Sequence, residues 1–128
     1  MKKVVVPCSG IGKAFGAVSR ETTHLLTQGM HSTDYRTVCL PLLMTDDTEA
    51  RQVIEESEVY VVDGCPMKCA SVVVKHAGGK PVMEIIVPKV LAVNKDHRPA
   101  TVLDIGEGGR LLCEDIVRII IERGGKDE

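Results

Sequence analysis

The protein has 128 residues, the size of one ordinary domain, and we expect a single domain over residues 1–128. Apolar residues make up 44% and charged residues 27% of the chain, which is typical of a globular protein with its own core. The net charge is −2, charges of both signs are interspersed, and aromatic residues make up only 2%, so nucleic acid is not an expected partner. No apolar run could span a membrane and no export signal is evident, so we expect a cytoplasmic protein without a membrane partner.

The first part of the chain alternates between strand and helix patterns. Lys3–Pro7 is a β-branched run, which predicts a strand that is covered on both faces. A glycine-containing turn follows, and Lys13–Gln28 then has the apolar spacing of a helix. Tyr35–Leu43 is predicted to be a second strand that carries Cys39, although Pro41 limits its hydrogen bonding.

The second part continues this alternation. In the order helix, strand, helix, strand and closing helix, the predicted elements are Thr48–Glu58, Glu58–Val62, Met67–Ala77, Pro81–Val87 and Leu111–Arg123. Pro66 is expected at the first position of the helix that precedes the fourth strand. The stretch Val90–Arg110 is ambiguous, and a short additional strand around Thr101–Ile105 is one interpretation of it.

Alternating strands and helices predict an α/β fold with helices on both faces of a parallel sheet. We therefore expect a three-layer sandwich with a mostly parallel sheet of four to five strands in the order 2-1-3-4, flavodoxin-like or Rossmann-like. In such sheets, ligands bind at the carboxyl ends of the strands where the strand order reverses. Here the reversal lies between the first and third strands.

The cysteines fall near this edge. Five is an odd number, and without an export signal a disulfide framework is not expected. Cys8 follows the first strand and Cys65 the third, and neighbouring strands are about 4.8 Å apart, close enough for two thiolates to share one zinc ion. Cys69 lies one helical turn beyond Cys65 and is expected on the same helix face. Cys39 starts roughly 10 Å from the third strand, so its chain must curve over the edge to reach the others.

The predicted helix start gives a reason to expect reactive thiolates. With Pro66 at the first helical position, Cys65 becomes the N-cap, where unpaired N–H groups stabilise a thiolate. Lys68 can add to this stabilisation, and Asp63 can hydrogen-bond the turn or orient a metal ligand. Cys113, by contrast, lies within an apolar helix and is predicted to pack in the core.

Two polar stretches have simpler interpretations. Ser9–Gly16 matches neither common phosphate-binding motif, so it is a tight turn or an anion-binding turn at a helix start. Asp46-Asp47 is expected to supply a helix N-cap rather than a catalytic pair of carboxylates.

With Asp63-Gly64-Cys65 and the other cysteines in view, the chain resembles the DGC-domain family, which is named after this tripeptide. The resemblance covers nearly the whole chain and rests on the tripeptide in combination with the cysteines before and after it. The family is described as zinc-binding on the strength of four cysteines. Carried over position by position, the resemblance implies the metal ligands Cys8, Cys39, Cys65 and Cys69.

Three functions remain open from the sequence. The first is a metal-binding protein that holds zinc in a cysteine cluster at the carboxyl edge of the sheet, with a biological role that is unknown. The second is a thiol-redox or persulfide-carrier protein that uses Cys65 with Cys8 and Cys69. The third is an iron–sulfur protein, although the spacing matches neither common ferredoxin pattern. A conventional enzyme stays a further open alternative, for which the sequence offers no clear acid–base pair or nucleophile–histidine arrangement.

Overall fold

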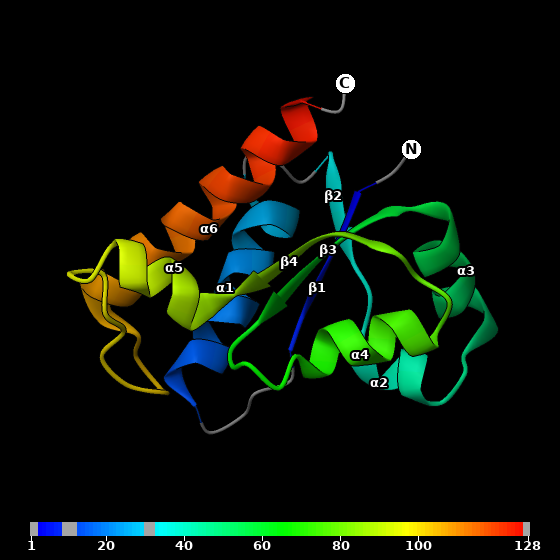
Figure 1. The fold of residues 1–128 in the computed structure, drawn as a ribbon, viewed down its shortest axis with the longest axis horizontal. Helices are drawn as coiled ribbons and strands as arrows, with labels where there is room; N and C mark the ends of the chain where they lie inside the picture. The colour runs from blue at the N-terminus through cyan, green and yellow to red at the C-terminus, as the bar shows by residue number, and fades with distance from the viewer. Residues whose placement is uncertain (1–2, 9–12, 30–32, 127–128) are drawn as a thin grey trace.

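A computed structural model gives the fold of the chain over residues 3–8, 13–29 and 33–126. Four parallel strands form its sheet, in the order β2-β1-β3-β4. This confirms the predicted α/β class, the parallel pairing and the 2-1-3-4 order (Figure 1). The strands are β1 (Lys3–Pro7), β2 (Tyr35–Thr37), β3 (Glu58–Asp63) and β4 (Pro81–Ile86).

Six helices lie within the described residues and alternate with the strands. They are α1 (Ala14–Gln28), α2 (Leu40–Met44), α3 (Thr48–Glu56), α4 (Cys69–His76), α5 (Val87–Val93) and α6 (Gly106–Lys126). The predicted helices 13–28 and 48–58 agree with α1 and α3 to within two residues at each end. Asp47 caps α3 as predicted, because its carboxylate accepts a hydrogen bond from the Ala50 N–H at 3.0 Å.

The central strands β1 and β3 are buried on both faces, which is why valine dominates their interior positions. Successive side chains of a strand point to opposite faces, so Val5 belongs to one core, and Val4 and Val6 belong to the other. The core that contains Val5 is completed by α1, α5 and α6, and the core that contains Val4 is completed by α2, α3 and α4. The result is the predicted three-layer sandwich (Figure 1).

The register brings the carboxyl ends of β1 and β3 together. Pro7 pairs with Val62, and the N–H of Cys8 donates to the carbonyl of Val62 at 3.0 Å. The chain segments that leave these two strands, one with Cys8 and one with Cys65, therefore start side by side.

The predicted strand Tyr35–Leu43 is wrong in its second half. β2 ends at Thr37, and Cys39 is the cap residue that precedes the short helix α2. Pro41 explains the change, because its missing N–H and fixed φ suit the first turn of a helix better than a strand interior.

The predicted helix Met67–Ala77 starts too early. α4 begins at Cys69, so Pro66 is not a helical residue and Cys65 is not its N-cap. Lys68 has a left-handed conformation with φ 55°, and its N–H donates to the Cys65 carbonyl at 3.2 Å. This turn separates the two cysteines, so their four-residue spacing is not a helical spacing.

The ambiguous stretch before the last helix does not contain the suggested strand. The segment 101–104 instead closes a turn, in which the N–H of Thr101 donates to the carbonyl of Asp104 at 2.9 Å. α6 begins at Gly106, five residues before the predicted start, and Gly106 has a left-handed φ of 70°, which glycine adopts without strain.

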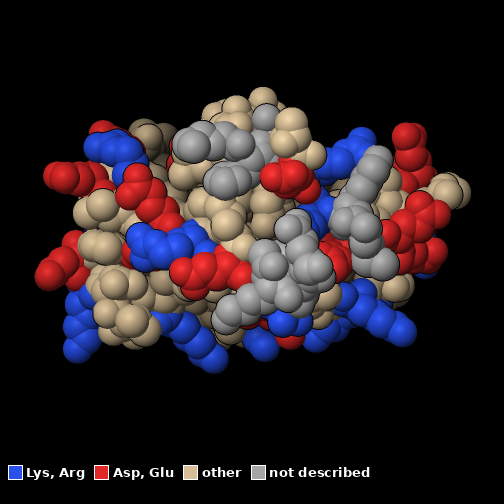
Figure 2. Space-filling model, turned by 90° about the horizontal axis from the view of Figure 1, so that it is seen from above, with Lys and Arg blue, Asp and Glu red and all other residues tan. Residues whose placement is uncertain are grey.

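Charges of both signs are interspersed on the face of the molecule that is seen from above in Figure 2. Of the helices in the described ranges, none has the length and apolar character that crossing a bilayer requires.

Candidate thiol site at the carboxyl edge of the sheet

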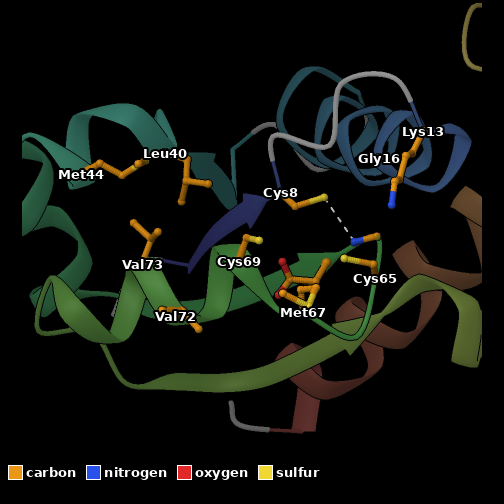
Figure 3. A pocket seen from close by; sticks show the side chains of 12 residues that line it. Cys8, Lys13, Gly16, Leu40, Met44, Cys65, Met67, Cys69, Val72 and Val73 are labelled. Carbon is orange, nitrogen blue, oxygen red and sulfur yellow. Dashed lines mark hydrogen bonds between the residues drawn. The ribbon is translucent and has the colours of Figure 1, made fainter.

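A cavity of about 510 Å³ opens at the carboxyl ends of β1 and β3 (Figure 3). We call it the thiol cavity, because the sulfur atoms of Cys8, Cys65 and Cys69 all face it. Most of the remaining wall is apolar. The other lining residues are Lys13, Gly16, Leu40, Met44, Asp63, Gly64, Met67, Val72 and Val73.

Cys8 is the most enclosed of the three thiols, with 8% of its surface exposed. Its backbone position follows from the pairing of β1 with β3. Its Sγ accepts a hydrogen bond from the Gly64 N–H at 3.2 Å and lies 3.7 Å from the hydroxyl oxygen of Ser19, to which the thiol donates. The thiol is therefore held by groups from both β3 and α1 before any ligand binds.

Gly64 is the point where the exit of β3 touches the start of α1. A Cβ atom at this position would lie 3.0 Å from the backbone nitrogen of Gly16 and 3.0 Å from the carbonyl carbon of Phe15. Both atoms belong to backbone, which cannot move aside cheaply. Only glycine allows this approach, and the same approach brings the Gly64 N–H to the sulfur of Cys8.

Asp63 caps α4 from seven residues away. Its carboxylate oxygens accept hydrogen bonds from the N–H of Ala70 at 2.9 Å and the N–H of Ser71 at 3.3 Å. Burial raises the pKa of Asp63 above its ordinary value, and the two backbone hydrogen bonds oppose this rise. The prediction that Asp63 hydrogen-bonds the turn is confirmed in this form, and the bond sets the first turn of α4, which carries Cys69.

The loop between β3 and α4 presents the other two thiols. Cys65 is half-buried and Cys69 is exposed, and both point into the cavity from opposite ends of the turn at Lys68. Met67, between them, is 75% exposed and forms part of the cavity rim. Cys69 thus reaches the cavity as the first residue of α4, close to the helix N-terminus as predicted.

Cys39 does not line the thiol cavity. It is exposed and lines a neighbouring cavity of about 320 Å³, whose wall also includes Cys8. The predicted set of four cysteines is thus divided, with three at the thiol cavity and Cys39 on the other side of Cys8.

Cys113 is fully buried, which confirms its predicted place in the core. Its thiol donates to the carbonyl of Val18 at 3.6 Å. Burial raises the pKa of Cys113 to about 11, so this thiol stays protonated under ordinary conditions.

The donor chemistry of the thiol cavity fits zinc, because thiolates are among the ligands that zinc prefers in proteins. The side chains of the thiol cavity lie farther apart than the ligands of a formed metal site. Within residues 3–8, 13–29 and 33–126, no three Cys, His, Asp or Glu side chains are grouped closely enough to hold one metal ion.

Several features of the cavity were not predicted from the sequence. The apolar wall from Leu40 and Met44 belongs to α2, whereas the sequence pattern predicts a strand up to Leu43. Ser19, the partner of the Cys8 thiol, carries no sequence signal of this role. The predicted turn Ser9–Gly16 lies partly outside the described residues, and of its described residues Lys13 and Gly16 line the cavity.

Comparison with known proteins gives one match. The family model for the DGC domain matches residues 4–108, which include all of the sheet except Lys3 and all three thiols of the cavity. Searches of curated proteins and of solved structures found no match. Since the family model covers most of the chain, this protein belongs to the DGC-domain family.

Proposed function

We propose that this protein binds a soft metal ion through the thiolates of Cys8, Cys65 and Cys69, and that this ion is zinc. The observation that carries the proposal is that three thiols face one cavity, one from the segment after β1 and two from the segment after β3. Thiols distributed over a fold for packing alone would be enclosed like Cys113, whereas Cys65 and Cys69 are accessible at the strand edge where such folds bind ligands.

The remaining ligand position is the second part of the proposal. Cys39 is the fourth cysteine that the family resemblance implies, and it lies beside Cys8 in the adjacent cavity. If Cys39 does not bind, three thiolates leave zinc with an open position, at which a metal ion of this kind polarises a bound group. Asp63 fixes the first turn of α4 and so positions Cys69 for either arrangement.

Competition between the reduced protein and a chromophoric zinc chelator tests the proposal. We expect one zinc per chain, and we expect Cys8→Ser, Cys65→Ser and Cys69→Ser each to weaken zinc binding. Loss of an outer-shell partner already lowers affinity about 10–100-fold, so loss of a direct ligand should cost at least about 100-fold. Cys113→Ser is the matched control and should bind like the wild type. Equal affinity in all four variants would rule out this set of ligands.

A second function is favoured by the size and character of the cavity. A volume of about 510 Å³ with mostly apolar walls is far larger than a metal ion needs and suits a small organic molecule. In this alternative, the thiolate of Cys65 attacks the outer sulfur of a persulfide, R–S–SH. A Cys65–S–SH persulfide forms, the donor S–S bond breaks and R–S⁻ leaves, so no separate oxidant is required.

Intact-mass measurement after incubation with a small-molecule persulfide tests this alternative. We expect the gain of one sulfur atom in the wild type and in Cys113→Ser, and no gain in Cys65→Ser. If all three proteins gain sulfur equally, the transfer is not specific to the cavity. We also propose a cytoplasmic location, because the described cysteines are all free thiols, which a reducing compartment preserves.

A further inference from the structure

The cavity next to the thiol cavity has a different chemical character. It lies at the carboxyl ends of β1 and β2, against α1, and has a volume of about 320 Å³. We call it the Arg20 cavity, because among the described residues of its wall Arg20 is the one with a charged side chain, and none of them is a carboxylate. Its lining residues are Pro7, Cys8, Arg20, Thr23, Thr37, Val38, Cys39, Leu40 and Pro41.

The side chain of Arg20 has a hydrogen-bond donor without an acceptor in the described part of the chain. Its Nη1 atom is buried, yet no residue in the described part of the chain accepts a hydrogen bond from it or forms an ion pair with it. A guanidinium carries five N–H donors, and a buried donor without an acceptor is costly. The neighbouring Thr23 hydroxyl donates to the carbonyl of Ser19 at 3.0 Å and accepts no hydrogen bond from Arg20 Nη1.

We propose that the Arg20 cavity binds a small oxyanion through the guanidinium of Arg20. Phosphate, sulfate and carboxylate groups share the chemistry that a guanidinium recognises, since two of their oxygens can accept its paired N–H groups. The ligand supplies the negative charge that the described wall lacks and oxygen acceptors for the guanidinium. Thr37, whose side chain is exposed at the same cavity, offers a hydroxyl as a further donor.

The oxyanion site is separate from the proposed metal site. Arg20 does not line the thiol cavity, and none of the apolar residues Met44, Met67 and Val72 lines the Arg20 cavity. Of the described lining residues, Cys8 and Leu40 alone belong to both walls. Oxyanion binding should therefore be found in metal-free protein, and its presence or absence does not decide whether zinc binds.

Calorimetric titration of reduced, chelator-treated protein with inorganic phosphate, sulfate and acetate tests the inference at constant ionic strength. We expect at least one of the three to bind with one site per chain, and Arg20→Gln to lower that affinity at least about tenfold, the fold-change that corresponds to one lost charge-assisted hydrogen bond. Arg36→Gln is the matched control, since Arg36 lies exposed on β2 and is outside the cavity. It should bind like the wild type.

Thermal unfolding keeps the test valid if a variant is less stable. A ligand that binds only the folded state raises the unfolding temperature, so the bound oxyanion should raise it in the wild type and in Arg36→Gln but not in Arg20→Gln. Retained binding in folded Arg20→Gln would overturn the inference. So would the absence of binding by all three oxyanions to the wild type, or an equal loss in Arg36→Gln.

Discussion

The backbone N–H of Gly64 donates a hydrogen bond to the Sγ of Cys8 at 3.2 Å, and so links two residues that are 56 positions apart in the chain. This bond connects the segments that leave β1 and β3. Each residue of the tripeptide Asp63-Gly64-Cys65 has its own role at this junction. Asp63 caps α4, Gly64 approaches α1 and contacts Cys8, and Cys65 faces the cavity.

Gly64→Ala should destabilise the protein because its Cβ would meet the backbone of Phe15 and Gly16. Forcing extra atoms into such a contact costs about 1–3 kcal/mol. Urea unfolding measures the change. Met67→Ala, at an exposed position of the same cavity, serves as the control and should change stability by no more than about 0.5 kcal/mol. Equal stability of Gly64→Ala and the wild type would show that the contact is not tight.

Asp63→Ala should loosen the start of α4, because two N–H groups lose their acceptor. Loss of a capping side chain costs about 0.5–2 kcal/mol. Hydrogen exchange should become faster at the amides of Ala70 and Ser71. The amide of Ala50, which Asp47 caps on α3, is the internal control and should keep its rate. Unchanged exchange at Ala70 would mean that Asp63 does not hold the helix start.

The same carboxyl group predicts a pH dependence. Burial raises the pKa of Asp63 in the folded state above the ordinary 3.8, so the folded protein binds this proton more tightly than the unfolded chain. Its contribution to stability is therefore complete below pH 3.8 and is lost as the pH rises through the folded-state pKa. Relative to Asp63→Asn, the wild type should lose stability over this range. A difference that does not change with pH would contradict the assignment.

The five cysteines should differ in their rates of alkylation. Cys39 and Cys69 are exposed and should react first at pH 8, whereas Cys113 should react only after unfolding. Because its pKa is about 11 rather than 9.0, Cys113 also contributes stability that is lost as the pH rises from 9 towards 11. Peptide mapping by mass spectrometry gives the order of labelling, and early labelling of Cys113 would contradict its place in the core.

The fold was largely predictable because its strands are short β-branched runs separated by helical patterns. That alternation permits few topologies, and the observed order brings Cys8 beside the exit of β3 as predicted. The starts of α2 and α4 were not predictable in the same way. The cap of α4 comes from Asp63, outside the helix, and Lys68 adopts a left-handed conformation that non-glycine residues seldom show.

The lining of the thiol cavity could not be predicted without the correct starts of α2 and α4. Since Pro41 lies in the first turn of a helix instead of limiting a strand, Leu40 becomes a wall of the thiol cavity and Cys39 turns to the neighbouring cavity. The unpaired donor of Arg20 likewise became visible only from its surroundings in three dimensions.

Elemental analysis of the protein, purified anaerobically without added metal or chelator, tests the central proposal most directly. We predict close to one zinc and no stoichiometric iron per chain, with zinc lost from Cys65→Ser and retained in Cys113→Ser. Zinc far below one per chain in the wild type, or an equal zinc content in Cys65→Ser, would contradict the proposal. Stoichiometric iron with visible absorbance would instead support the iron–sulfur alternative.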